Sequence, residues 1–173
     1  MVVTLGTLGT LGTLVTFYYF CTMNLVVDIG NSSTKVALFD DGRKLSVSRI
    51  KVLSLKELEQ ELSDPKIDKA IISSVRKLPS SILDLFRSKI PYVHQLSHKS
   101  KLPFRIEYET PETLGTDRLA GVAGAYSLFP KSELLVIDAG TAITYDFLSE
   151  SIYKGGNISP GLNMRFMAII FCH

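Results

Sequence analysis

The chain has 173 residues, of which 46% are hydrophobic, and it carries a formal net charge of +2. This composition is typical of a globular protein with a core, and charges of both signs are interspersed, so no nucleic-acid partner is indicated. The two cysteines, Cys21 and Cys172, form neither a disulfide framework nor a metal-binding spacing, which favours a reducing, cytoplasmic setting.

Residues 1–22 differ in composition from the rest of the chain. They contain no charged residue and repeat Thr-Leu-Gly three times. The segment is long enough to span a bilayer, but threonine and glycine dilute its apolar character and no basic residue flanks its start. We expect a non-native or disordered extension, with Met23 as the working start and no membrane association. A signal or anchor segment is the alternative.

From Met23 onward, apolar patterns predict strands that alternate with helices. In the first predicted helix Ser54 is the expected N-cap, with Glu57 three residues later in a capping-box arrangement. A three-stranded meander followed by alternating helices and strands predicts an α/β domain with a mixed sheet. The predicted strands are 24–30, 34–40, 45–52, 68–75 and 92–96, and the predicted helices are 54–64, 80–90 and 116–129.

Polar side chains gather where the first predicted strand ends. Asp28 is followed by Gly30 and Asn31, then by three hydroxyl residues and Lys35. A plain hairpin needs only two turn residues, whereas this run offers backbone amides, hydroxyls and a cation, which suit a phosphate. We expect Asp28 to hold Mg²⁺ through water, because Mg²⁺ keeps much of its hydration shell. The alternative is a polar hairpin loop whose side chains bind their own backbone.

Asp117 stands at the start of the helix predicted at 116–129. Asp is a preferred helix cap, so one interpretation is a purely structural role. The positive end of a helix also favours an ionised carboxylate, which a proton acceptor requires. Gly121 and Gly124 lie inside the same helix, where each costs about 1 kcal/mol relative to alanine, so we expect them at close-packing positions.

The chemistry of the first strand pair recurs later in the chain. Residues 26–40 and 136–148 each contain an apolar strand that ends in Asp-x-Gly, at Asp28 and at Asp138, before a second strand. Two domains that each present such a turn can hold a nucleotide from both sides. The repeat therefore predicts two related halves around a phosphate-binding site.

Four motifs follow one another in order: DIGNSSTK at 28–35, GTDRLAGVAGAY at 115–126, VIDAGTAITYD at 136–146 and GGNISPGLNMR at 155–165. The duplicated arrangement resembles the acetate and sugar kinase, heat-shock ATPase and actin superfamily with its ribonuclease-H-like domains. The four motifs together resemble type III pantothenate kinase over about residues 23–166. This resemblance implies ATP-dependent phosphorylation of pantothenate to 4'-phosphopantothenate, the first step of coenzyme A biosynthesis, by a cytoplasmic homodimer.

The resemblance also implies a role for individual residues. Asp117 is the expected catalytic base, Arg118 is expected to bind the substrate carboxylate, and Asp138 is expected to hold a monovalent cation, K⁺ or NH₄⁺. The expected ATP contacts are Asp28, Ile29, Gly30, Asn31, Ser32, Ser33, Thr34, Lys35 and Thr141. The expected substrate contacts are Tyr108, Gly115, Thr116, Asp117 and Arg118.

The implied fold is an α/β ribonuclease-H-like (actin-like ATPase) domain with a mixed sheet at 23–130, followed by the truncated start of a second such domain at 131–173. The family continues beyond the last motif, so we expect a shortened chain with no measurable kinase activity and poor solubility. We also expect the strand pair within 133–150 to lack a covering helix layer. The alternative is an inactive fragment, or a non-catalytic nucleotide-binding or interaction protein of the same superfamily.

Overall fold

A computed structural model describes residues 23–31, 33–50, 55–64 and 66–171 of the chain. The extension expected at 1–22, the hydroxyl of Ser32 and the N-cap expected at Ser54 lie outside the described residues. Among the helices of the described residues, none combines the length and the apolar character needed to cross a membrane.

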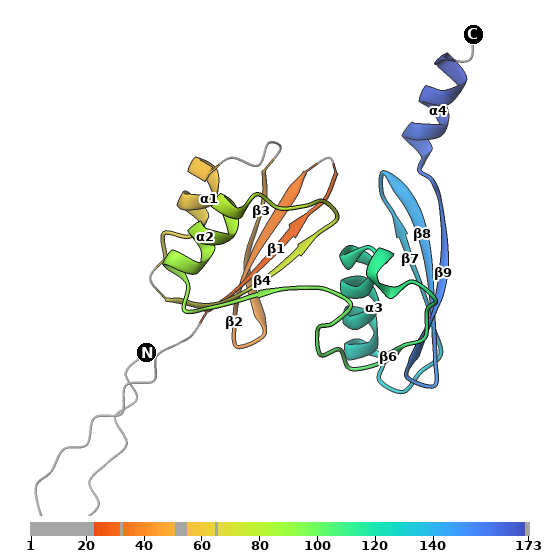
Figure 1. The fold of residues 1–173 in the computed structure, drawn as a ribbon, viewed down its shortest axis with the longest axis horizontal. Helices are drawn as coiled ribbons and strands as arrows, with labels where there is room; N and C mark the ends of the chain where they lie inside the picture. The colour runs from red at the N-terminus through yellow and green to blue at the C-terminus, as the bar shows by residue number, and fades with distance from the viewer. Residues whose placement is uncertain (1–22, 32, 51–54, 65, 172–173) are drawn as a thin grey trace, which may run out of the picture.

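The first sheet is mixed, as the sequence predicts, and has the strand order β3-β2-β1-β4-β5 (Figure 1). β1 pairs antiparallel with β2 and parallel with β4, because the β1–β2 connection is a tight turn whereas β4 is reached through a helix. The strands are β1 (Met23–Ile29), β2 (Thr34–Asp40), β3 (Arg43–Ile50), β4 (Ile67–Ser74) and β5 (Tyr92–Gln95).

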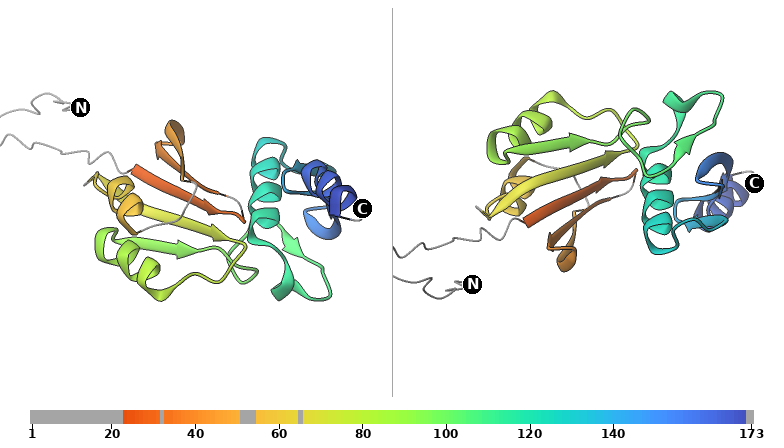
Figure 2. Two further views of the ribbon diagram at one scale, coloured as in Figure 1. Left: turned by 90° about the horizontal axis from the view of Figure 1, so that it is seen from above. Right: turned by 90° about the horizontal axis from the view of Figure 1, so that it is seen from below.

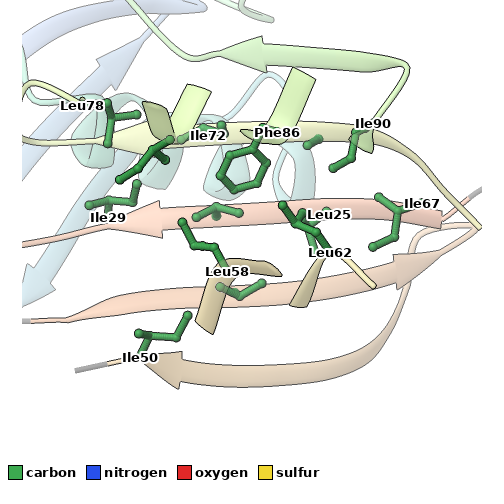
Figure 3. Packing of buried hydrophobic residues seen from close by; sticks show 14 residues of the cluster. Leu25, Ile29, Ile50, Leu58, Leu62, Ile67, Ile72, Leu78, Phe86 and Ile90 are labelled. Atoms are coloured by element: carbon green, nitrogen blue, oxygen red, sulfur yellow. The ribbon is translucent and has the colours of Figure 1, made fainter. Parts of the chain in front are cut away.

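Two helices, α1 (Leu55–Glu61) and α2 (Ser80–Lys89), cover one face of this sheet (Figure 1). Figure 3 shows Leu58 and Phe86 from the helices against the strand residues Leu25, Ile29 and Ile72, all of them almost fully buried. Alternate strand residues point to opposite faces, so Asp28, which lies next to Ile29, is on the face away from these two helices.

The second sheet has the order β6-β9-β8-β7, in which β7, β8 and β9 form an antiparallel meander like that of β1, β2 and β3. This is the structural counterpart of the Asp-x-Gly repeat. The sheet contains a strand that the sequence pattern does not predict, since the segment after Ser151 adds β9 beside β8. The elements are β6 (Arg105–Ile106), β7 (Leu134–Ala139), β8 (Ala142–Ser149) and β9 (Ile152–Pro160), with a short 3₁₀ turn at Pro111–Thr113.

Helix α3 (Thr116–Leu128) stands between the two sheets (Figure 2) and contacts β4, β7 and β8. Its buried residues Leu119 and Val122 join a second core with Leu148 of β8 and Tyr153 of β9. The expectation that the strands at 133–150 lack a helix layer is therefore wrong for one face, because α3, which precedes them in the chain, covers it. The first domain expected at 23–130 thus shares its last helix with the second sheet.

The other face of the second sheet is apolar and open. Leu135 and Ile137 of β7 and Phe147 of β8 alternate with the inward residues and are exposed. Helix α4 (Leu162–Phe171) extends away from the sheet (Figure 1). Close packing at Gly124 is also not found, because a Cβ there would have no neighbour within 4 Å, and one at Gly121 would make only ordinary contact with Val136.

Candidate functional site

Asp28 lies at the end of β1, opposite Lys35 of β2 and beside Ser73 of β4 in the strand register. All three share the face that α1 and α2 leave open. The Nζ atom of Lys35 is 3.7 Å from Oδ2 of Asp28, and both side chains are partly solvent-accessible. Oδ1 of Asp28 is buried and has no hydrogen-bond partner among the described residues. A buried, unpartnered carboxylate oxygen is suited to a cation or to a water that hydrates one.

The turn after Asp28 is closed by a hydrogen bond of 3.1 Å from the Gly30 amide to the Ser33 carbonyl. Asn31 is exposed at its tip, and Ser33 is partly buried. Ile29 and Thr34 are opposite one another in the register and are both almost fully buried on the face that the helices cover. Of the residues expected at ATP, Asp28 and Lys35 therefore share a face, while the side chains of Ile29 and Thr34 point into the core.

Thr116 connects the two halves of the structure. Its hydroxyl accepts a hydrogen bond of 3.0 Å from the Ser74 amide, donates one of 3.0 Å to the Ser74 carbonyl, and lies 3.1 Å from the hydroxyl of Ser73. The Thr116 hydroxyl is thus used to fix the start of α3 to the end of β4. It brings the following residue, Asp117, to the open face of the first sheet.

Asp117 is the second residue of α3, and the N-cap position belongs to Gly115. Its Oδ1 accepts a hydrogen bond of 2.9 Å from the amide of Arg118. A Cβ at Gly115 would lie 2.4 Å from the same oxygen, so any larger residue there would displace the carboxylate from this position. The structural alternative thus holds only in part: the carboxylate satisfies one amide of the first turn without being the cap.

The pKa of Asp117 is raised above its usual range, contrary to the expectation from the helix dipole alone. Burial is the largest cause, and the negative charges of Asp28 and Asp138 add to it, whereas the hydrogen bond from the Arg118 amide opposes it. The carboxylate of Asp117 is therefore within electrostatic reach of both Asp-x-Gly turns. A raised pKa also makes this carboxylate a stronger proton acceptor.

The second turn follows Asp138, which lies opposite Thr144 on the α3 face of the second sheet and is exposed. The Gly140 amide donates a 2.9 Å hydrogen bond to the Ala142 carbonyl. The Gly30 amide closes the first turn in a similar way, by donating to the Ser33 carbonyl. Thr141 is exposed, and its carbonyl accepts a 3.0 Å hydrogen bond from the amide of Gly161. The fourth motif thus supports the turn of the third.

Arg118 points from α3 into the second core, where it meets an acid that the sequence analysis did not assign. Its Nε and Nη2 atoms are 2.9 and 2.7 Å from Oδ1 of Asp146, which is almost fully buried. Although burial disfavours the charged guanidinium, the hydrogen bond to Asp146 raises the pKa of Arg118 further. The hydroxyl of Tyr153 donates a 2.6 Å hydrogen bond to the same oxygen.

Tyr108, the remaining expected substrate contact, lies next to this group. Its ring centroid is 6.4 Å from that of Tyr153. The ring occupies the space beside Gly155, whose φ is +104° and where a Cβ would lie 2.9 Å from the ring.

Asp146 could have been found in the sequence, because it is a charged residue at an inward position of an apolar strand, among residues 142–148.

No group of three or more histidine, cysteine, aspartate or glutamate side chains in the described part of the chain is arranged to hold a metal ion. The donor set at Asp28 fits a hydrated divalent ion, since one carboxylate with an unpartnered buried oxygen can bind such an ion through its water shell. Phosphate oxygens of a bound nucleotide would supply the remaining ligands.

The site therefore consists of two Asp-x-Gly turns, one on each sheet, with an acidic helix start between them. Together with the mixed-sheet α/β fold, this arrangement defines a protein of the actin-like ATPase fold class. The sequence profile of the type III pantothenate kinases matches residues 24–171. The chain belongs to the type III pantothenate kinase family.

Individual relatives agree with this assignment. The chain is 45% identical over 149 residues to a type III pantothenate kinase from Phocaeicola vulgatus, which covers 85% of this chain and 61% of the relative. It is 47% identical over 149 residues to a Bacteroides fragilis enzyme of the same name, with the same coverage. The chain thus spans about three fifths of the length of these relatives.

A solved structure from Campylobacter jejuni, described as a conserved Baf family transcriptional activator, has a similar fold. It superposes with a TM-score of 0.54 at 25% sequence identity, covering 86% of this chain and 60% of the other. The likeness supports the fold.

Proposed function

We propose that this protein takes part in the transfer of the γ-phosphoryl group of ATP to the primary hydroxyl of pantothenate, which gives ADP and 4'-phosphopantothenate. The observation that carries the proposal is the position of Asp117 between Asp28 and Asp138. The negative charges of these two residues, in addition to burial, raise the pKa of Asp117. Phosphoryl transfer depends mainly on positioning and on charge neutralisation. The two turns on either side of Asp117 serve positioning, and Lys35 together with a bound Mg²⁺ would serve neutralisation.

The first turn is suited to the phosphates of ATP. Lys35 offers a positive charge on the same face as Asp28. Asp28 would hold Mg²⁺ through water, and this ion when bound neutralises charge on the phosphate oxygens. On the second turn, Asp138 would hold K⁺ or NH₄⁺, and Thr141 would contact ATP.

Asp117 is the proposed general base. The substrate oxygen attacks the γ-phosphorus as the bond from that phosphorus to the ADP oxygen breaks, and the hydroxyl proton passes to the Asp117 carboxylate. The partly buried position of Asp117 raises its proton affinity, which favours this transfer. The hydrogen bond from the Arg118 amide holds one carboxylate oxygen in place and so orients the other.

We assign the substrate carboxylate to Arg118 and a further substrate contact to Tyr108. Arg118 carries a full positive charge with a planar set of donors, and Tyr108 lies beside the group that binds it. Gly115 leaves room for the Asp117 carboxylate, and Thr116 fixes the loop to β4. The same proposal includes a cytoplasmic homodimer as the working form of the protein.

The test is an ADP-release assay with pantothenate, Mg²⁺ and K⁺, on the full chain and on a chimera in which residues 23–166 replace the matching part of the Phocaeicola vulgatus relative. The chimera is expected to turn over, and Asp117→Asn in it to lower turnover at least about 100-fold, the scale of general-base catalysis. Asp84→Asn, an exposed acid on α2, is the control and should have no effect. ATP hydrolysis that does not depend on pantothenate would contradict the proposal.

A further inference from the structure

The ion pair between Arg118 and Asp146 is the most deeply buried charged contact among the described residues. The exposed fractions of the two side chains are 11% and 2%. Two nitrogens of Arg118 and the hydroxyl of Tyr153 converge on a single oxygen, Oδ1 of Asp146. Replacing such a pair by apolar residues of similar size often leaves stability unchanged or improves it, so stability alone is a weak reason for its presence.

The geometry fixes the direction of Arg118. A guanidinium has five donors in one plane, and here Nε donates a hydrogen bond to Oδ1 of Asp146, while Nη2 lies 2.7 Å from the same oxygen in the ion pair. Nη2 is buried and makes no hydrogen bond with the described residues, so the protein does not satisfy its donors. Because the plane is rigid, holding one edge sets the direction in which the remaining donors point.

Tyr153 joins this ion pair to Tyr108. Its hydroxyl donates to Asp146, and its ring lies against the ring of Tyr108 at a centroid distance of 6.4 Å. Tyr153 is fully buried, so we do not assign it a direct contact with the substrate. Its side chain contacts Asp146, the partner of Arg118, and also the ring of Tyr108.

We propose that Asp146 and Tyr153 are positioning residues, which hold the Arg118 guanidinium in one orientation beside Tyr108 and thereby set a preference for a substrate that carries a carboxylate. This inference rests on the proposed function, in which Arg118 binds the substrate carboxylate. An arginine held in place before binding loses less side-chain freedom when the ligand arrives, and this improves affinity for a ligand whose geometry matches.

The experiment uses the full chain and three variants. Asp146→Asn keeps the shape and one acceptor but removes the charge, and Tyr153→Phe removes one donor. Tyr126→Phe is the matched control, because it removes a tyrosine hydroxyl of the same core whose 2.7 Å hydrogen bond goes to Ser151. Calorimetry gives the dissociation constants of pantothenate, of its neutral alcohol analogue pantothenol, and of Mg·ATP. Nuclear magnetic resonance gives the hydrogen-exchange rate of the Arg118 Nε–H.

Asp146→Asn is expected to weaken pantothenate binding at least about tenfold, because it removes the charge that holds Arg118, and Tyr153→Phe about threefold, because Asp146 keeps its own contact with Arg118. In both variants the dissociation constants of pantothenol and of Mg·ATP should change less than about twofold, which is below the effect of one lost hydrogen bond. The hydrogen-exchange rate of the Arg118 Nε–H should increase in Asp146→Asn and Tyr153→Phe and stay unchanged in Tyr126→Phe.

Equal weakening of all three ligands would overturn the proposal, because it would mark Asp146 as merely structural, and so would unchanged pantothenate binding in Asp146→Asn. If the unaltered chain binds Mg·ATP but not pantothenate, the proposed function fails. The positioning role is then decided by the Arg118 signal: faster exchange in both variants supports it, and unchanged exchange overturns it.

Discussion

The hydroxyl of Thr116 is bound to both backbone groups of Ser74, accepting from its amide and donating to its carbonyl at 3.0 Å each. These hydrogen bonds join residues 42 positions apart in the chain, and they tie the start of α3 to the end of β4. Because Asp117 follows Thr116 and Asp28 lies beside Ser73, the contact sets the separation between the proposed base and the first Asp-x-Gly turn.

Thr116→Val should therefore disturb the site as well as the fold. Valine has the shape of threonine but cannot satisfy the Ser74 amide, which we expect to cost about 1–2 kcal/mol of unfolding free energy in urea. Hydrogen exchange at the Ser74 amide should become faster in the same variant. Thr116→Ser keeps the hydroxyl and is the control, expected to lie within about 0.5 kcal/mol of the unaltered chain. Equal stability of the valine and serine variants would contradict this role.

Asp117→Asn should increase stability at neutral pH. The folded pKa of Asp117 is raised, mainly by burial, so the folded state binds this proton more tightly than the unfolded state. The unfolding free energy therefore falls as pH rises from the usual carboxyl pKa through the raised one, and is level above it. The asparagine variant lacks this penalty. Its melting temperature should exceed that of the unaltered chain at pH 7, and the difference should shrink towards pH 3, with Asp84→Asn as the control.

Asp138→Asn tests whether the second turn acts on Asp117. Removing the charge of Asp138 removes one cause that raises the pKa of Asp117, so this pKa should fall. Carbon-13 resonance of the Asp117 carboxyl, followed by titration, measures the change directly and without turnover. The exposed Asp84→Asn again serves as the control, and an unchanged titration in Asp138→Asn would place Asp138 out of reach of the base.

Local patterns in the sequence account for much of the fold. The strand at Met23–Ile29, the turn after Asp28 and the matching pair around Asp138 were predictable, because alternating apolar residues, glycine and aspartate each restrict the backbone over a few positions. The strand Ile152–Pro160 was not predicted, since it contains Gly155, Gly156 and a terminal proline, which are typical of turns.

Contacts between distant segments could not be read from the sequence. The pairing of Arg118 with Asp146 and that of Thr116 with Ser74 join residues 28 and 42 positions apart, and each depends on how two sheets and a helix meet. The direction of the Asp117 pKa shift has the same origin. The helix start favours the ionised form, but the burial that outweighs it comes from tertiary structure.

Asp28→Asn should weaken Mg·ATP binding about tenfold or more while pantothenate binding stays within about twofold, since the lost group is a charged ligand of a hydrated metal. Little stability should be lost, because the contact with Lys35 is 3.7 Å long and partly exposed. In excess EDTA the unaltered chain and the variant should bind ATP alike. A variant that still binds more weakly in EDTA would show that Asp28 acts on the fold or the nucleotide and not through a metal.

Alanine at two glycines should have opposite effects. At Gly161 a Cβ would lie 2.3 and 2.4 Å from the carbonyl oxygens of Thr141 and Gly140, so the second turn has to shift. We expect Gly161→Ala to lower the unfolding free energy by about 1–3 kcal/mol and to weaken Mg·ATP binding.

The opposite effect is expected at Gly124, inside α3. A Cβ there would meet nothing within 4 Å, and alanine has the higher helix propensity. Gly124→Ala should therefore stabilise the protein by about 0.5–1 kcal/mol, raise the melting temperature by about 1–4 °C and leave nucleotide binding unchanged. If the melting temperature of Gly161→Ala equals or exceeds that of Gly124→Ala, the turn at Thr141 can move without cost. Gly161 would then give no support to the proposed contact between Thr141 and ATP.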